Sequence, residues 1–390
     1  MGWSLHRKPG VTFHNPAYSF KGYTIATPIG GDAVYLLDMA GRVVHSWSFP
    51  DAKPEYGYLT DDGRLLVRCQ IPEPPGTPFK PAMEDDPPMP LEERARKLPS
   101  NYRFLREADW DGTILWQHED PVLHHDFWKT RRDTFLVTRF VAMEKALSGK
   151  VRGARRAKAS HHPMLTDEFQ ELNRAGEVVW SVRLDAVLDP RLDPLGTLER
   201  RIEWTHTNSI CESADGAKVM FSSKNTNRVG IIDKAAKTLD WRFGHPVTSG
   251  QHHARWLPNG NIHMFDNGTR REGLPFSRAI EVDPATDRVV WEYQANPPFS
   301  LFSPNISSAD RLPNGNTLIC EGMSGRILEV TRRGETVWEW HNPFAQSVRG
   351  GQVSFALWRA HRYGPDHPAL KGRDLDPARF RALNEMYGLG

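Results

Sequence analysis

The sequence has little cysteine, no excess of charge and no long apolar run. Three cysteines in 390 residues, Cys69, Cys211 and Cys320, exclude a disulfide-rich fold. Each lies in a strand-like run, so we expect a small buried side chain at these positions. Lys and Arg total 50 against 48 Asp and Glu, which leaves no net field to attract nucleic acid or a membrane.

Signals for membrane or nucleic-acid binding are also missing. No apolar run has membrane-spanning length, and residues 1–9 lack the apolar centre of a signal peptide. A soluble, cytoplasmic protein is therefore expected. The basic stretch 145–158 contains no aromatic residue, which argues against a nucleic-acid interface. The sequence predicts no oligomeric state.

Tryptophan and glycine, in contrast, are plentiful and recur in a pattern. An alternating strand, a polar turn and a second strand ending in Trp occur at residues 33–47, 102–116, 169–180, 229–241, 279–291 and 327–338. Other hairpins lie between these, at residues 58–69, 124–137, 207–222, 251–268 and 307–321. Two hairpins per repeat are typical of four-stranded propeller blades.

The repeat predicts an all-β fold, a six-bladed β-propeller in one domain spanning residues 1–390. Strands at 22–27 and 353–359 would share one blade and close the ring. Residues 72–100, with a short helix at 91–97, and 143–162 are expected as inserted loops, and 365–390 as an extension with a helix at 377–387. The loop 143–162 is either simply solvated or a basic lid that attracts an anionic substrate.

Two of the hairpins share the same turn but open differently. Pro258-Asn259-Gly260-Asn261 and Pro313-Asn314-Gly315-Asn316 are both hairpin turns. Only the first is preceded by histidines, His252 and His253. We therefore interpret the two hairpins as one shared scaffold, with a functional site added where the first strand of one hairpin begins.

Alignment of the hairpins on the turn predicts which side chains face the propeller axis, because side chains alternate along a strand. The predicted axis-facing residues are His125, His206, Asn208, His252, Ser307, Glu55 and Asn305. A single histidine would be explained by a hydrogen-bonded strand end. Three histidines and an asparagine in equivalent positions favour a polar site. His253 falls on the opposite face, and the adjacent His124 leaves open which residue of the pair His124 and His125 faces the channel.

Several motifs together resemble the bacterial arylsulfotransferase family. They are His206-x-Asn208-Ser209, Gln251-His252, Leu257-Pro258-Asn259-Gly260-Asn261, Phe265-Asp266-Asn267-Gly268, Ser277-Arg278, Arg311-Leu312-Pro313-Asn314-Gly315-Asn316 and Arg359-Ala360-His361-Arg362-Tyr363. The resemblance implies a six-bladed propeller that transfers a sulfuryl group from a phenolic sulfate ester to a phenol. It needs no nucleotide donor and no cofactor.

The resemblance also implies roles for individual residues. His252 would be the nucleophile that becomes transiently sulfated, with His206 and His125 as further catalytic residues. The residues expected to bind a small aromatic or anionic substrate are Asn208, Lys224, Ser307, Asn305 and His124. Lys224 stands where the family has a sulfate-binding arginine, so the charge is kept but the planar guanidinium fork is lost.

Two alternative functions remain open from the residues alone. His125, His206 and His252, with Glu55 near, could hold a divalent metal such as zinc in a hydrolase or lyase. A non-catalytic binding propeller could use the same face to hold a partner.

Overall fold

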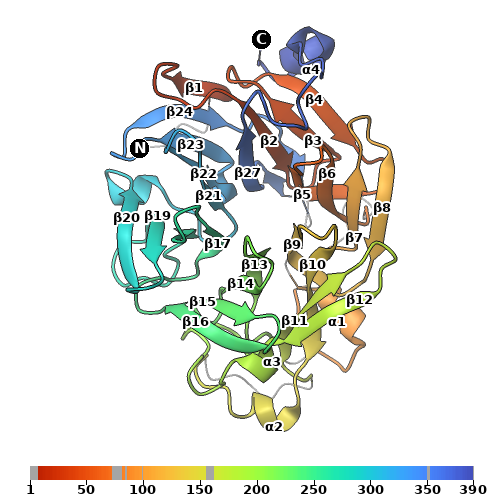
Figure 1. The fold of residues 1–390 in the computed structure, drawn as a ribbon, viewed down its shortest axis with the longest axis vertical. Helices are drawn as coiled ribbons and strands as arrows, with labels where there is room; N and C mark the ends of the chain where they lie inside the picture. Colours follow the sequence, from red (N-terminus) through yellow and green to blue (C-terminus); the bar gives the residue numbers. More distant parts are fainter. Residues whose placement is uncertain are drawn as a thin grey trace. The chain divides into compact units, whose positions relative to one another are not determined.

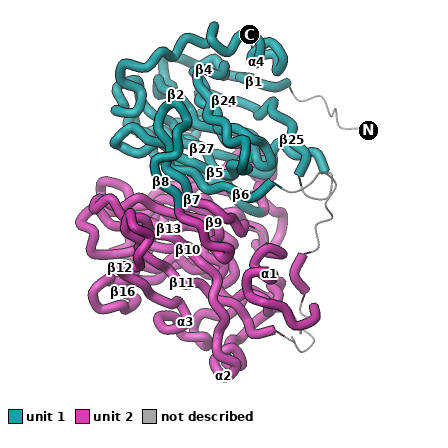
Figure 2. Tube along the Cα trace, turned by 90° about the vertical axis from the view of Figure 1, so that its right-hand side faces the viewer, with its two compact units in different colours: residues 1–78, 105–117, 305–390 teal, residues 79–104, 118–304 magenta. Residues whose placement is uncertain are grey.

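The computed structural model of the chain describes residues 8–72, 81–83, 86–98, 100–154, 162–348 and 352–389. Its strands pair antiparallel, mostly in chain order, in six sheets of four or five strands and one small pair. The fold is a six-bladed β-propeller, as the repeat predicted. Contacts divide the chain into two compact units with three of the six sheets each (Figure 2).

The first unit spans residues 1–78, 105–117 and 305–390. Its five-stranded sheet runs β1 (Gly10–His14), β24 (Thr336–His341), β23 (Arg326–Val330), β22 (Thr317–Glu321), β21 (Ser308–Arg311). Its second sheet runs β27 (Leu357–Tyr363), β2 (Tyr23–Pro28), β3 (Ala33–Leu37), β4 (Val43–Ser48). The third runs β5 (Lys53–Leu59), β6 (Leu65–Gln70), β7 (Phe104–Ala108), β8 (Ile114–Glu119).

The second unit spans residues 79–104 and 118–304. One sheet runs β12 (Val178–Arg183), β11 (Leu165–Leu172), β10 (Phe135–Ala142), β9 (Leu123–Lys129). The next, green in Figure 1, runs β13 (Thr207–Glu212), β14 (Lys218–Ser223), β15 (Arg228–Asp233), β16 (Thr238–Gly244). The last runs β17 (His252–Trp256), β18 (Ile262–Asp266), β19 (Arg278–Asp283), β20 (Arg288–Gln294). Short helices are α1 (Leu91–Arg96), α2 (Lys145–Ser148), α3 (Leu184–Val187) and η1 (Pro298–Ser300).

The two ends of the chain meet in one sheet, as predicted. Tyr23 of β2 pairs with Tyr363 of β27, so the last strand of the chain is the edge strand of this sheet. The predicted C-terminal strand at 353–359 was placed too early, because Val353–Ser354 form β26 and pair with β25 (Gln346–Ser347). The predicted terminal helix is present as η3 (Pro377–Phe380) and α4 (Arg381–Met386), after the short η2 (Gly322–Ser324).

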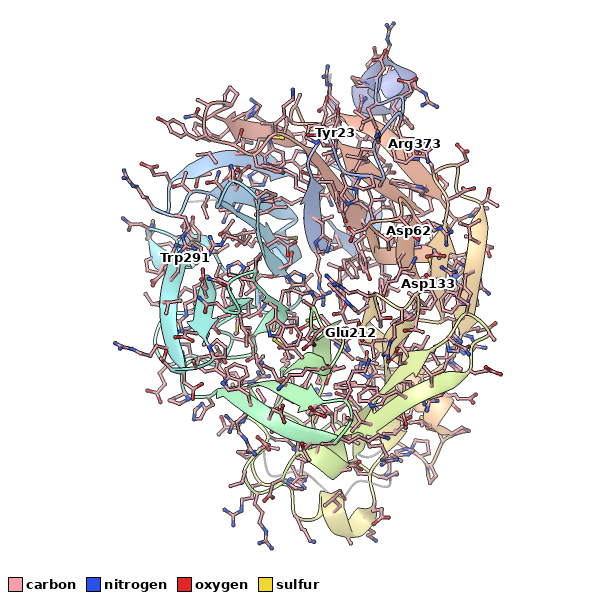
Figure 3. The ribbon with its side chains drawn as sticks, viewed as in Figure 1. Tyr23, Asp62, Asp133, Glu212, Trp291 and Arg373 are labelled. Atoms are coloured by element: carbon pink, nitrogen blue, oxygen red, sulfur yellow. The ribbon has the colours of Figure 1, made fainter. Side chains whose placement is uncertain are left out.

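The recurring tryptophans explain how neighbouring blades are joined. Trp180 of β12 donates its indole N–H to the carbonyl of Lys234 in the next sheet, at 2.8 Å. Trp241 of β16 donates to Asp287, also at 2.8 Å. In the first unit, Trp47 and Trp338 donate to carbonyls of the following sheet. Trp291, labelled in Figure 3, occupies the same position on β20. A Trp at this place can pack its ring and pair its N–H at the same time.

The three cysteines are buried and free, as expected for small apolar side chains. Burial raises the pKa of Cys211 to about 11, so this thiol stays protonated. Helix α1 confirms the helix predicted in the first insert. Residues 155–161, which carry three of the six Lys and Arg residues of the predicted basic lid, lie outside the described residues, as do 73–80, 84–85 and 99 of the first insert. Within the described part of the chain, no helix is long and apolar enough to cross a membrane.

Candidate functional site

Three histidine-bearing strands lie together in the second unit. β9, β13 and β17 are each the edge strand of their sheet, and β13 contacts both of the others. The sequence places His124 and His125 on β9, His206 just before β13, and His252 at the start of β17. All four side chains are at least nine-tenths buried. The fold therefore brings together residues that are more than a hundred positions apart.

The backbone is unusual where these histidines lie. His125, His206 and His253 have φ values of +53°, +55° and +56°, in the left-handed region that residues other than glycine rarely adopt. The pairing register also shifts within β9, β13 and β17 at these places. Such bulges re-aim side chains near the ends of strands and are frequent at functional sites.

The bulge in β9 changes one sequence-based expectation. Strict alternation would put His124 and His125 on opposite faces, whereas their Nδ1 atoms lie 2.8 Å apart. The ring of His124 stacks on Phe140, with a centroid distance of 3.9 Å. His124 thus packs against Phe140 of β10 and also contacts its neighbour His125.

These histidines form a continuous line of polar contacts. Nε2 of His125 lies 3.0 Å from Nε2 of His206, whose Nδ1 lies 2.7 Å from the Glu203 carboxylate. At the other end, Nε2 of His124 lies 3.4 Å from Asp167. Two of the three predicted catalytic histidines, His125 and His206, are therefore in direct contact.

His252 is held separately, in a single tautomer. Its Nδ1 lies 2.7 Å from the Asn267 side-chain oxygen and 2.9 Å from the Gly250 carbonyl. The Asn267 amide nitrogen donates to the Ser303 carbonyl at 2.8 Å, which fixes its oxygen toward the ring. Because both neighbours of Nδ1 accept, the hydrogen of a neutral His252 is on Nδ1, and Nε2 keeps its lone pair.

The electrostatic surroundings keep His252 neutral. Burial, and then the positive charge of Lys224, lower the pKa of His252 to about 3. An imidazole with this pKa is uncharged at neutral pH. His252 therefore offers an available lone pair on Nε2, as a nucleophile requires.

Lys224 follows β14 and belongs to the same cluster. Its backbone N–H donates to the carbonyl of His206 at 3.2 Å. Burial lowers the pKa of Lys224, and the charge of Glu203 partly opposes this effect. Across the described residues no carboxylate forms an ion pair with the Lys224 ammonium, so this cation is available to an anionic ligand.

The motif residue before His252 anchors the strand opening. The side-chain nitrogen of Gln251 donates to the carbonyls of Ser223 and Arg228, at 3.1 and 2.9 Å, and its oxygen accepts from Thr248 at 3.0 Å. The carbonyl of Gln251 accepts from the Asn208 amide at 2.7 Å. Asn208, predicted to bind substrate, thus links β13 to the residue beside His252.

Ser307 and Asn305 belong to the first unit. Ser307 has a φ of +88°, and its hydroxyl accepts from the Gly322 N–H at 3.0 Å. Glu55, in the same unit, pairs with Arg68 at 3.1 Å. Ser307 therefore binds the backbone of Gly322, and Glu55 binds the buried guanidinium of Arg68.

The suggested metal ligands do not converge. Among the described residues, nitrogen atoms of His125, His206 and His252 form no set lying within 4.8 Å of one another. A tetrahedral site needs its ligand atoms at about that spacing or closer. The arrangement instead keeps one neutral histidine apart from a hydrogen-bonded pair.

Sequence reasoning missed four residues of the site. Asn267 could have been found, because the pairing of His252 with Phe265 brings it back beside the histidine. Glu203 precedes His206 by three residues, but nothing in its segment predicted the contact. Asp167 lies on β11, in a run that looks like an ordinary alternating strand.

Arg270 is the fourth missed residue. Its side chain is 12% exposed and pairs with Glu199, yet its Nε and Nη1 have no hydrogen-bond acceptor among the described residues. Arg270 and Lys224 both lie next to Gly250. A Cβ atom at this glycine would be 3.5 Å from Nη1 of Arg270 and 3.9 Å from Cγ of Lys224. Two cationic side chains therefore flank Gly250, whose carbonyl accepts from His252.

Comparison with known proteins gives the family. Residues 101–343, more than half of the 390-residue chain, match the family described as arylsulfotransferase (ASST). The chain is 24% identical over 302 residues to arylsulfate sulfotransferase AssT of Escherichia coli O6:H1, covering 57% of this chain and 50% of that protein, so it spans half the length of this relative. A protein of unknown function from Bacteroides caccae has a similar fold, with a TM-score of 0.53 and 13% identity over 88% of this chain and 98% of that one. The chain belongs to the arylsulfotransferase family.

Proposed function

We propose that this chain transfers a sulfuryl group from a phenolic sulfate ester to a phenol, with His252 carrying the group between them. Membership of the family supports sulfuryl transfer between aryl compounds. The observation that supports His252 as the carrier is its fixed tautomer, which leaves the Nε2 lone pair free of both acceptors at Nδ1. No cofactor takes part in this proposal.

The first half-reaction follows from this geometry. Nε2 of His252 attacks sulfur, the bond between sulfur and the aryl oxygen breaks, and the electron pair leaves with that oxygen as a phenolate. The proton that neutralises the phenolate comes from the pair His125 and His206. A phenol then attacks the sulfated histidine, gives up its proton, and leaves as the new sulfate ester, which regenerates neutral His252.

Positive charge is needed where the sulfuryl oxygens develop charge in the transition state. Lys224 supplies one cation without a carboxylate partner among the described residues, and burial lowers its pKa from the ordinary value because little water surrounds it. Arg270 supplies a second, because its Nη1 also lies next to Gly250. The family's single arginine is thus replaced by two side chains, of which Lys224 occupies the expected sequence position.

Steady-state kinetics with a chromogenic aryl sulfate and a phenol test this proposal. A covalent carrier predicts ping-pong kinetics, that is, parallel lines when donor and acceptor are varied together. Intersecting lines would require both substrates to be bound at once and would contradict the sulfated intermediate. His263→Gln, a buried histidine on the opposite strand of the same hairpin, is the matched control. The His263→Gln variant should keep the parallel-line pattern of the wild type.

A further inference from the structure

Five residues of the second unit form a line that begins and ends with a carboxylate. From Glu203 the contacts pass through His206, His125 and His124 to Asp167, at 2.7, 3.0, 2.8 and 3.4 Å. Each ring nitrogen of the three imidazoles lies in one of these contacts, and Nε2 of His124, at 3.4 Å from Asp167, is close to this carboxylate without a hydrogen bond among the described residues. Such a line fixes how many protons it can hold, because each contact accommodates one hydrogen.

The count starts from the three shorter contacts. Each joins a nitrogen to a nitrogen or to a carboxylate oxygen and needs one hydrogen, so three are required. Three neutral imidazoles carry three hydrogens, which would leave Nε2 of His124 without one. A bare nitrogen lone pair would then face the Asp167 carboxylate at 3.4 Å, which is repulsive. A fourth hydrogen removes this repulsion.

The fourth hydrogen does not belong to Asp167. The other oxygen of this carboxylate accepts the Thr207 N–H at 2.7 Å, an interaction that favours the ionised form. Burial raises the pKa of Asp167, but His124 and Thr207 outweigh burial, and the pKa lies below its ordinary value. Glu203, at the other end of the line, interacts with the cationic Lys224, so we assign the hydrogen to the histidines.

We propose that His124, His125 and His206 hold one excess proton in common, balanced by Asp167 and Glu203, and that this proton is the one given to the leaving phenolate. Asp167, Glu203 and His124 are then positioning residues, which set the charge and tautomers of the other two histidines. This inference rests on the proposed function for the use of the proton, but not for its existence.

The positive charge can move along the line. Two hydrogens lie between pairs of nitrogens, and a shift of either one moves the charge to the next imidazole without breaking a contact. The charge can therefore reside on His124, beside Asp167, or on His206, beside Glu203. Lys224, whose charge is felt by both Glu203 and His252, favours the positions away from itself.

The proton balance of the reaction is closed by this line. When the bond between sulfur and the aryl oxygen breaks, that oxygen takes the hydrogen shared by Nε2 of His125 and Nε2 of His206. The three imidazoles are left neutral, with three hydrogens between them, and the two carboxylates keep their charges. In the second half-reaction the acceptor phenol returns a hydrogen to the same place as its oxygen attacks sulfur.

Nitrogen-15 spectra of histidine-labelled full-length protein test the proton count at pH 8, without any substrate. Single histidine substitutions assign the signals, and the chemical shifts distinguish protonated from unprotonated ring nitrogens. Four hydrogens on the six nitrogens of His124, His125 and His206 are expected, whereas three would overturn the proposal. His361 is an internal reference for a charged ring: burial lowers its pKa, but Tyr56 and Asp310 outweigh this and raise it to about 9.

Asp167→Asn tests the role assigned to the carboxylate. Its oxygen must continue to accept the Thr207 N–H, so its amide nitrogen faces His124 and donates. The count should therefore fall from four to three. Asp193→Asn is the control: it alters another buried carboxylate, one that pairs with Arg228 and not with the histidines. It should leave four hydrogens on the three histidines. An unchanged count in Asp167→Asn would overturn the role of this residue.

The use of the proton is tested separately, by varying the leaving group. A phenol of high pKa needs a proton as it leaves, whereas nitrophenol does not. Asp167→Asn should lower kcat with phenyl sulfate by about 10²-fold and kcat with nitrophenyl sulfate by less than about tenfold. An equal loss with both donors would overturn proton delivery. If the wild type showed no turnover, the proposed function would be contradicted. The proton count would then be decided by the nitrogen-15 spectra alone.

Discussion

Two hairpins of the molecule share a Pro-Asn-Gly-Asn turn but differ in the residue near the start of their first strand, which we call the opening. Leu257 N donates to Asn261 O at 2.7 Å, and Leu312 N donates to Asn316 O at 2.8 Å. Gly260 and Gly315 have φ values of +86° and +87°. At the opening, however, the first hairpin carries His252, whereas the second carries Ser307, whose hydroxyl accepts from a backbone N–H.

This difference separates what the fold requires from what the chemistry requires. The turn residues meet the same geometric demand in both hairpins, so their recurrence carries no information about function. The opening residue is free to vary because a β-bulge and a left-handed residue nearby set the direction of its side chain. The proposed function therefore depends on the residues at the start of the first hairpin, His252 and its partner Asn267.

The largest expected effect is on kcat, and it should differ between substitutions at the openings of the two hairpins. His252→Ala should lower kcat by at least about 10³-fold, because it removes the group that we propose to carry the sulfuryl group. Ser307→Ala should instead lower the free energy of unfolding by about 1 kcal/mol, through loss of the Gly322 hydrogen bond. Turnover with an aryl sulfate and urea unfolding measure the two. A comparable loss of kcat in both variants would remove the distinction.

Lys224 should have the next largest effect. Lys224→Met keeps the volume but removes the charge, and we expect kcat to fall by about 10²-fold, as for loss of one group that stabilises an oxyanion. Lys224→Arg retains charge and restores the family's residue, so kcat should stay within about tenfold of the wild type. Equal losses in both variants would show that shape, and not charge, matters at this position.

The low pKa of His252 predicts a dependence of stability on pH. The folded protein keeps His252 neutral down to about pH 3, while the unfolded chain takes up a proton below its ordinary value of 6.5. Stability conferred by this group is thus present above pH 6.5 and is lost as the pH falls toward 3. At pH 5 the loss is about 2 kcal/mol. Urea unfolding at pH 7 and pH 5 should show this extra loss in the wild type and not in His252→Asn.

The smallest effect concerns the shared turns. Gly260→Ala and Gly315→Ala place a side chain in the left-handed region, with no atom within 4 Å of the added carbon in either case. Each should cost about 1 kcal/mol of unfolding free energy, with kcat unchanged. Thermal unfolding compares them. Unequal costs would mean that the two turns are not the same scaffold.

Much of the fold could be predicted from the sequence because it repeats. Each recurring Trp ends a hairpin, and at least four of the six donate to the next sheet, so the number of sheets follows from the spacing of tryptophans. The boundary of the last strand was wrong because Val353–Ser354 alternate as a strand would, yet pair with a nearby segment. Strand β1, which adds a fifth strand to one sheet, was not predicted, since no Trp hairpin includes it.

The site was predicted only in part, for a physical reason. His125, His206 and His252 could be proposed as site residues because they stand at fixed distances from turn residues. Their partners Asp167 and Glu203 come from other segments, and only the bulged backbone brings His124 beside His125. Alternation along a regular strand has no way to indicate such a bulge.

The central claim is that His252 carries the sulfuryl group, and mass spectrometry after reaction with donor alone tests it most directly. With aryl sulfate but no phenol, the intact protein should gain the mass of one sulfuryl group, and peptide mapping should find it on His252. The gain should disappear on addition of phenol and should be absent in His252→Ala. Turnover without any adduct, or an adduct on another residue, would contradict the account.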